Sequence, residues 1–253
     1  MNAIVRIVVA FLATFALALT VAAQYATADS LQREELIVQP GEQFRAVQLI
    51  VPGVLMTAGV VGSVSPWYKE HVNIPVRDYA TQLRGERGLH FEDYIQYIPT
   101  VGFLGLGYGV PCEHGMAERL CITATAYASV GILVNAAKYT IRVPRPDNAA
   151  RNAFPSGHTA TAFMGAEMLR REYGPWWGLG GYAIAATTAL MRVYNGRHWT
   201  SDLLGGAAIG ILSVDIAYWL LPLERRILNI SPGQDRVFSV LPTPYGISFA
   251  CTF

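Results

Sequence analysis

The apolar residues of this chain are gathered into blocks, and several blocks are long enough to cross a membrane. An α-helix rises 1.5 Å per residue, so about 20 apolar residues span the ~30 Å hydrocarbon layer. The block at 46–65 contains 20 residues and no charged side chain. Similar blocks occupy 94–110, 120–137, 175–191 and 203–221. This pattern predicts an all-α fold, a polytopic membrane helix bundle of about six helices.

A sixth block, at 159–169, holds only 11 residues and includes Glu167. It can cross a membrane only if its helix begins near Ser156 and if Arg170 and Arg171, at the far end, extend their charged groups toward water. We therefore expect this helix to continue beyond the apolar residues at both ends.

Charged residues make up only 15% of the chain, against roughly 25% in an ordinary soluble domain. The formal net charge is +1, so the chain lacks the basic excess with which proteins bind nucleic acids. The apolar content excludes a disordered chain. Cys112, Cys121 and Cys251 are too few and too scattered for a disulfide framework or a zinc site.

The N-terminus is typical of a secretory signal. Residues 1–23 combine one basic residue with an apolar run and then small residues, which predicts cleavage after Ala23 or Ala28. A retained membrane anchor is the alternative, and both interpretations direct the chain to a membrane. At the other end, residues 229–253 alternate like short strands, and we assign no function to this tail.

Small residues recur at helix-packing spacing in two of the blocks. Gly206 and Gly210 are one turn apart, and so are Gly102 and Gly105. Small residues let membrane helices approach closely where hydrophobicity alone cannot hold them together. We therefore expect both pairs to lie at helix contacts. The polar stretch at 67–93 is predicted to be an amphipathic helix near the membrane interface.

Polar residues gather at the ends of the blocks in three clusters. In the first, Pro144 and Pro146 must end the helix that arrives from 120–137. Lys138 and Arg145 then lie on a rigid turn that can direct both cations at one point. A basic flank at the membrane surface, without a function, is the alternative.

The second cluster opens the sixth block with the sequence Pro155-Ser156-Gly157-His158. A helix N-terminus attracts anions through its free N–H groups and the positive end of its dipole. Ser156 can cap the helix, Gly157 lets an oxyanion approach the backbone, and His158 can reach a bound ligand. A capped helix with an interfacial histidine is the alternative.

The third cluster, between the last two blocks, contains Arg192, His198 and Asp202. His198 and Asp202 are four residues apart, so on a helix they share a face and the carboxylate can hold one imidazole nitrogen. The other nitrogen keeps a free lone pair, as a nucleophile or base requires. Arg192 supplies a bidentate fork suited to phosphate. A purely structural histidine–aspartate pair is the alternative.

Alternating helices bring the three clusters to one membrane face if 159–169 and 175–191 each cross once. Three cations, a helix N-terminus, two histidines and an aspartate then converge, which is the composition of a phosphate-transfer site.

The three clusters together resemble the signature of the type 2 phosphatidic acid phosphatase superfamily. The family pattern is Lys, six residues, Arg-Pro; then Pro-Ser-Gly-His; then Ser-Arg, five residues, His, three residues, Asp. This chain has the three signatures in order, with every spacing intact, at 138–146, 155–158 and 192–202. Met191 stands where the family usually has serine.

The resemblance implies a role for each matching residue. His198 is expected to attack phosphorus and carry a phosphohistidine, with Asp202 orienting it. His158 is expected to protonate the leaving alkoxide. The phosphoryl oxygens are expected to be held by Lys138, Arg145, Ser156, Gly157 and Arg192. No metal and no other cofactor is expected, because the cations already neutralise the phosphate.

The family also contains soluble acid phosphatases and vanadium-dependent haloperoxidases, so the resemblance leaves the substrate open. The apolar block at 203–221 favours an integral-membrane lipid phosphatase, with 24–228 as its membrane-embedded phosphatase domain. Lipid A is the first candidate substrate; undecaprenyl pyrophosphate, phosphatidylglycerol phosphate and phosphatidic acid are the alternatives. A haloperoxidase and a non-catalytic membrane protein are the alternatives of another class.

The expected location is the inner membrane of a bacterium, with the active site facing the periplasm. Arg170, Arg171, Arg225 and Arg226 mark the opposite side, which the positive-inside rule places in the cytoplasm. The block at 46–65 should then begin in the cytoplasm, whereas a cleaved signal would leave the mature N-terminus outside, and the sequence leaves this conflict open. The expected partners are the bilayer and a lipid phosphate, with no nucleic acid and no evident obligate protein partner.

Overall fold

The computed structural model describes residues 42–85, 88–147, 149–232, 237–243 and 246–252. The signal-like segment predicted at 1–23, with its cleavage sites, lies outside these residues. The helical elements, in chain order, are η1 (Ala46–Leu49), α2 (Ile50–Val64), α3 (Pro66–Tyr68), η2 (Lys69–Asn73), α4 (Ile74–Arg84), α5 (Glu92–Ile95), α6 (Ile98–Gly105), η3 (Leu106–Tyr108), α7 (Met116–Ile141), α8 (Gly157–Tyr173), α9 (Pro175–Tyr194) and α10 (Thr200–Leu228). The strands β1 (Val237–Thr243) and β2 (Gly246–Thr252) follow.

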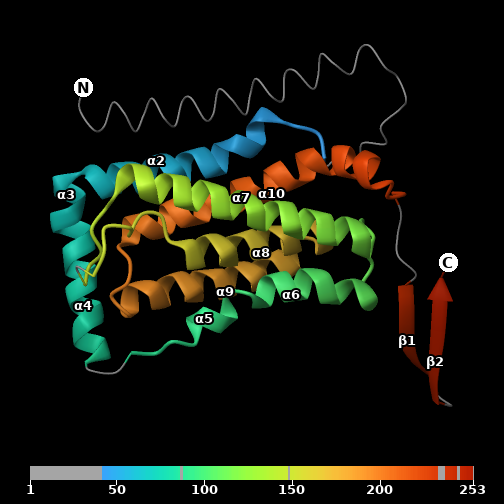
Figure 1. Ribbon diagram of the computed structural model, residues 1–253. Helices are drawn as coiled ribbons and strands as arrows, with labels where there is room; N and C mark the ends of the chain where they lie inside the picture. Colours follow the sequence, from blue (N-terminus) through green and yellow to red (C-terminus); the bar gives the residue numbers. More distant parts are fainter. Residues whose placement is uncertain (1–41, 86–87, 148, 233–236, 244–245, 253) are drawn as a thin grey trace, which may run out of the picture.

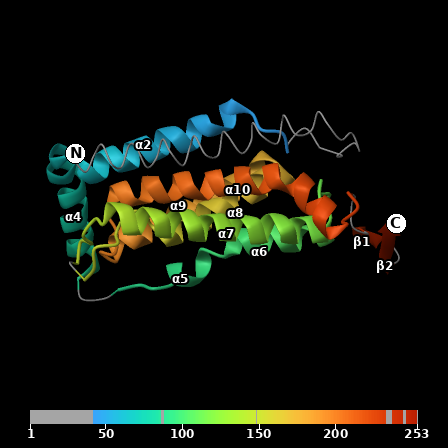
Figure 2. The same ribbon diagram turned by 45° about the horizontal axis from the view of Figure 1, so that its top comes forward.

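The long helices lie side by side in a bundle, and α3 and α4 lie across one end of it (Figures 1 and 2). α7 ends at this covered end, where α8 and α10 begin (Figure 1). Within the part of the chain that the structure describes, three segments are long and apolar enough to cross a membrane, judged by length and composition: Ala46–Val64, Met116–Ile141 and Thr200–Leu228. The predicted all-α membrane bundle is therefore confirmed.

The sixth block forms the interior of the bundle rather than a lipid-facing span. α8 packs against α6, α9 and α10, and most of its side chains are buried. As expected, the helix starts directly after Ser156, whose side-chain oxygen accepts a hydrogen bond from the Thr159 backbone N–H at 3.4 Å. Because other helices surround it, this segment can fold without a continuous apolar surface.

The arginines at the far end of α8 differ from the expectation that both extend toward water. Arg171 is only 12% exposed and forms ion pairs with Glu167 and Asp215. Arg170 is 48% exposed and donates two hydrogen bonds to Glu167, at 2.7 and 2.6 Å. A buried carboxylate needs such partners, so Glu167 holds the arginines against the bundle.

The block at 94–110 does not form one spanning helix. Its residues are divided among α5, the eight-residue α6 and η3. Pro99 is tolerated in the first turn of α6, whereas the glycines after it weaken the helix. α6 packs closely on α8, because a Cβ placed on Gly165 would lie 2.8 Å from the Thr100 backbone nitrogen.

One of the two predicted glycine pairs lies at a tight helix contact, and the other does not. A Cβ on Gly206 would lie 2.5 Å from the Ser156 carbonyl oxygen, and one on Gly210 would meet the backbone of Ala160 and Met164. α10 and α8 therefore touch backbone to backbone. The expectation for Gly105 was wrong, because a Cβ there would meet nothing within 4 Å.

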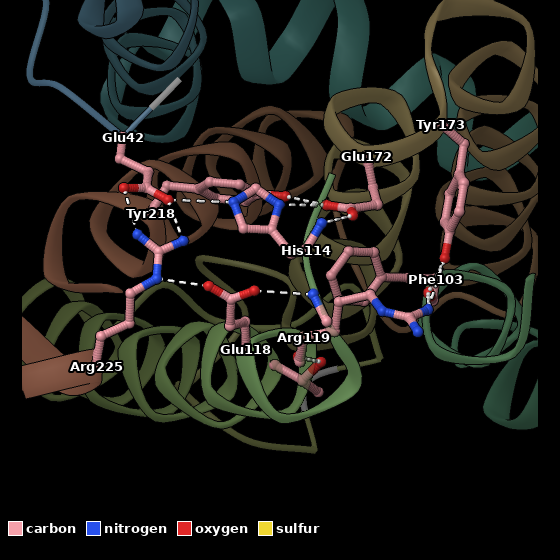
Figure 3. Close-up of polar contacts among 11 residues, drawn as sticks. Glu42, Phe103, His114, Glu118, Arg119, Glu172, Tyr173, Tyr218 and Arg225 are labelled. Carbon is pink, nitrogen blue, oxygen red and sulfur yellow. Dashed lines mark hydrogen bonds and ion pairs between the residues drawn. The ribbon is translucent and has the colours of Figure 1, made fainter. Parts of the chain in front are cut away.

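A buried ionic cluster ties several segments together (Figure 3). It lies where α7 begins and α10 ends, at the end of the bundle away from α4 (Figure 1). Arg225 binds Glu118 at 2.5 Å and Glu42 at 2.6 Å, while His114 binds Glu42 at 3.2 Å and Glu172 at 2.8 Å. Burial lowers the pKa of His114, but the hydrogen bonds to the two carboxylates outweigh burial and raise the pKa to about 9. The imidazolium thus links α8 to Glu42, which precedes η1.

The C-terminal tail contains an antiparallel hairpin. β1 pairs with β2 from Val237 opposite Thr252 to Thr243 opposite Gly246. The sequence analysis expected short strands in this part of the tail, at 237–241 and 245–250.

We expect Gly206→Ala to lower the stability of the protein by about 1–3 kcal/mol, because the added methyl group would force α10 away from α8. Thermal unfolding of the purified protein in detergent measures this. Gly131→Ala in α7 is the matched control, because a Cβ there meets nothing within 4 Å. Equal stability of the two variants would contradict the tight helix contact.

Candidate active site

All three polar clusters lie at the end of the bundle that α4 covers. Lys138 lies in the last turn of α7 and Arg192 in the last turn of α9, while Ser156 caps α8 and Asp202 lies in the first turn of α10. The structure therefore brings together the residues that the sequence analysis expected at one membrane face.

Hydrogen bonds between the loops fix the positions of the three clusters relative to one another. The backbone N–H of Ser156 donates to the carbonyl of Asp202 at 3.0 Å, which joins the starts of α8 and α10. The indole of Trp199 donates to the carbonyl of Pro144 at 2.8 Å, and the N–H of Ala153 donates to Val143 at 2.9 Å. The site is thus set by backbone contacts as well as by side chains.

His198 and Asp202 meet by a different geometry from the one predicted. They do not share a helix face, because α10 begins at Thr200 and His198 precedes it. Asp202 instead reaches back from the first turn, where its Oδ2 accepts from the Trp199 N–H at 2.8 Å and from His198 Nδ1 at 3.3 Å. An ionised carboxylate only accepts, so Nδ1 carries the proton and Nε2 keeps its lone pair.

The surroundings of His198 favour its neutral form. Burial lowers the pKa of this histidine below its ordinary value, and the positive charges of Arg192 and Lys138 lower it further, while Asp202 opposes them. The side chain is 2% exposed. At neutral pH His198 is therefore an imidazole with a free lone pair.

Two cations, Arg192 and Lys138, act on this imidazole, and Arg145 lies near both of them. Lys138 interacts electrostatically with Arg145 and Arg192, and with the carboxylate of Asp202. The Arg145 guanidinium is oriented by Asn152, whose side-chain oxygen accepts from Nε at 2.8 Å. Like charges held this close repel one another, and a bound anion would relieve that repulsion.

The second cluster supplies both a buried cap and a half-buried histidine. Ser156 is fully buried, and its hydroxyl oxygen accepts from the hydroxyl of Thr159 at 3.0 Å as well as from the backbone. Contact of Ser156 and Gly157 with phosphate stays a prediction. His158 is 31% exposed on its side chain, and its Nε2 lies 2.8 Å from Asp93 Oδ1.

Sequence reasoning missed three residues of the site. Asp93 contacts both His158 and Arg192, and the neighbouring Glu92, fully buried, accepts from Arg192 at 3.3 Å and from Asn195 at 2.6 Å. The sequence does contain an indication that Glu92 and Asp93 belong to the site, because they adjoin an apolar block as the other clusters do. The polar pattern of 67–93 instead places them in the predicted interfacial stretch.

Comparison with known proteins bears on the same part of the chain. Residues 119–226 match the family model of the PAP2 superfamily. This segment of the chain is therefore similar to the PAP2 superfamily. It contains the three signatures at 138–146, 155–158 and 192–202, whereas Glu92 and Asp93 precede the PAP2 match.

Several known proteins are similar to parts of this chain. A lipid A 1-phosphatase of Porphyromonas gingivalis is 41% identical over 133 residues, which are 51% of this chain and 30% of that protein. The chain thus spans less than a third of that relative. The crystal structure of LpxE from Aquifex aeolicus matches with a TM-score of 0.42 and 20% identity, over 57% of this chain and 93% of that one. A PAP2-type phosphatidylglycerolphosphate phosphatase from Bacillus subtilis matches with a TM-score of 0.35 and 22% identity, over 75% and 90%.

We expect His198→Ala to lower phosphate release on the order of a thousandfold or more, as for other nucleophiles that act within a concerted unit. Asp202→Asn should reduce the rate less, because the imidazole is kept. The measurement is the rate with purified protein in detergent, alongside His71→Ala, an exposed histidine on η2, as the control. An acid-labile phosphoenzyme trapped at a residue other than His198 would contradict the assignment.

Proposed function

We propose that this protein hydrolyses the phosphate monoester of a membrane lipid through a phosphohistidine on His198, without a metal. The observation that carries the proposal is a buried, neutral imidazole with one nitrogen held by Asp202, near Lys138 and Arg192, which in turn lie near Arg145. A nucleophile with a free lone pair beside cations that can bind phosphoryl oxygens is suited to phosphoryl transfer.

The proposed reaction has two steps. The Nε2 lone pair of His198 attacks phosphorus, the P–O bond to the lipid breaks, and the leaving alkoxide takes a proton from His158. A water molecule then attacks phosphorus, His158 accepts its proton, and the P–N bond breaks to release inorganic phosphate and free His198. The three cations stabilise the charge that moves onto the phosphoryl oxygens in both steps.

The position of the site supports a lipid substrate. Lys138 lies in the last turn of α7 and Asp202 in the first turn of α10, and both helices are apolar enough to cross a membrane. The reacting groups therefore lie close to the depth of lipid headgroups. A lipid in the same leaflet presents its phosphate there at a high effective concentration.

Lipid A is the first candidate among membrane lipids. The P. gingivalis relative carries the name lipid A 1-phosphatase, and its 41% identity extends over 133 residues. Undecaprenyl pyrophosphate, phosphatidylglycerol phosphate and phosphatidic acid remain the alternatives. A panel of these purified lipids, assayed for phosphate release at equal surface fraction in micelles, ranks them.

We expect a long-chain phosphate ester to be hydrolysed with a higher kcat/KM than its water-soluble short-chain version, at matched bulk concentration in detergent micelles. Each acyl methylene stabilises the lipid at membrane depth by about 0.8 kcal/mol, and a soluble ester lacks this term. Equal kcat/KM values, with no dependence on the surface fraction of the lipid, would refute the lipid substrate. His198→Ala serves as the background control for both esters.

We further propose that the site faces the periplasm from the inner membrane. Arg170, Arg171, Arg225 and Arg226 lie toward the ends of α8 and α10 that are remote from the site. The positive-inside rule counts lysines and arginines rather than net charge, so their ion pairs do not remove this bias.

Cysteine labelling tests this orientation in a variant that lacks the native cysteines. A membrane-impermeant maleimide, added to cells with a permeabilised outer membrane, should label Asp78→Cys on α4 but not Arg226→Cys on α10. Both positions are exposed in the structure, so accessibility within the fold is matched. The reverse labelling pattern would place the site in the cytoplasm.

A further inference from the structure

Asp93 lies in the site although it belongs to none of the three signatures. It is the second residue of α5 and precedes the segment that matches the PAP2 model. Its Oδ1 lies 2.8 Å from His158 Nε2 and 3.3 Å from Arg192 Nη1. One carboxylate thus joins the histidine of α8 to the arginine of α9.

The local structure around Asp93 holds its carboxylate in place. The Asp93 N–H donates to the His90 carbonyl at 3.3 Å, and its own carbonyl accepts from the Gln96 side chain at 2.8 Å. Glu92, fully buried beside it, anchors α5 to α9 through Asn195 and Arg192. The Asp93 side chain remains 47% exposed, as a group at the edge of a substrate site must be.

We propose that Asp93 is the positioning residue of the general acid, which holds His158 through Nε2 and favours its protonated form. This inference rests on the proposed phosphatase function. An ionised carboxylate only accepts hydrogen bonds, so Nε2 keeps its proton against Asp93 and Nδ1 is the nitrogen left for the leaving group. A histidine bound in this way has a fixed ring orientation, as in other histidine–carboxylate pairs.

In this arrangement His158 gives up one proton in the first step and regains one in the second. The imidazolium of His158 gives its Nδ1 proton to the alkoxide oxygen as the P–O bond breaks, and a neutral imidazole with a proton on Nε2 remains. In the second step Nδ1 accepts the proton of the attacking water, which restores the imidazolium. The Nε2–H···Asp93 hydrogen bond persists throughout, so no other proton donor is required.

The charges that face His158 explain why the carboxylate matters. Burial lowers the pKa of His158, and so do Arg192 from α9 and His198 from the loop before α10. Asp93 from α5 raises it and so opposes them in part, and the pKa of His158 stays below its ordinary value. Without Asp93 the acid form of His158 should therefore be lost at a lower pH.

The same contacts permit a second interpretation of Asp93, which predicts the opposite effect on activity when its charge is removed. Asp93 touches two groups that a phosphate would contact, so its carboxylate could occupy the phosphate position and compete with substrate. Removing its charge would then raise kcat/KM. The positioning role predicts a loss instead, so one variant separates the two.

The experiment compares Asp93→Asn with the unchanged chain in detergent micelles, on an alkyl phosphate lipid and on an aryl phosphate. A general acid contributes roughly 10²–10⁴-fold when the leaving group needs a proton, and little when it does not. We expect kcat on the alkyl phosphate to fall on the order of a hundredfold and kcat on the aryl phosphate to change by about twofold or less. The alkaline limb of the kcat profile should move to lower pH.

Three further variants complete the test. Asp78→Asn, which removes an exposed carboxylate on α4, should leave both rates and the pH profile unchanged. Asp93→Glu keeps the carboxylate and should retain the alkaline limb, which provides a second measurement if Asp93→Asn folds poorly. In a His158→Ala background, Asp93→Asn should cause no further loss.

Each outcome bears on one proposal only. Equal losses on both phosphates, an unmoved alkaline limb, or a raised kcat/KM would overturn the positioning role. Absence of phosphate release from every lipid by the unchanged chain, with retained hydrolysis of the aryl phosphate, would instead refute the lipid phosphatase function, and the pH profile on the aryl and a soluble alkyl phosphate would still test Asp93.

Discussion

The backbone contact between α8 and α10 is the constraint on which the site depends. A side chain at Gly206 would strike the Ser156 carbonyl, so only glycine lets the starts of the two helices meet. The hydrogen bond from the Ser156 N–H to the Asp202 carbonyl, 3.0 Å long, is possible because of this approach. The contact places the N-terminus of α8 beside Asp202, which orients His198. The other loops of the site are hydrogen-bonded around these two helix starts.

Charged residues are distributed unevenly along the bundle, and they are paired differently at its two ends. Away from the site, Arg225 and His114 are each bound to two carboxylates, so the buried charges there are compensated (Figure 3). At the site, Arg192 is also paired, with Glu92 and Asp93, but Lys138 and Arg145 add two further positive charges near it. A group of cations held close together is suited to an anionic ligand.

The sequence predicted the signatures and the helix ends better than the contacts between them. α8 starts after Ser156 and α7 ends before Pro144, as capping and proline geometry require. The pairing of His198 with Asp202 was expected on one helix face, whereas Asp202 reaches back from the first turn of α10. A spacing of four residues permits both geometries, so spacing alone could not distinguish them.

The length of the apolar blocks and the positions of proline and glycine are local properties, so the amino-acid sequence was enough to predict a helical membrane bundle with three polar clusters at helix ends. The presence of Asp93 in the site, in contrast, follows from the folding of the whole chain. Its contact with His158 spans 65 residues of chain and depends on α5 packing against α8 and α9. The tertiary structure also decided that 94–110 is broken into short helices and that 159–169 is buried, because both depend on what surrounds each segment rather than on its own composition.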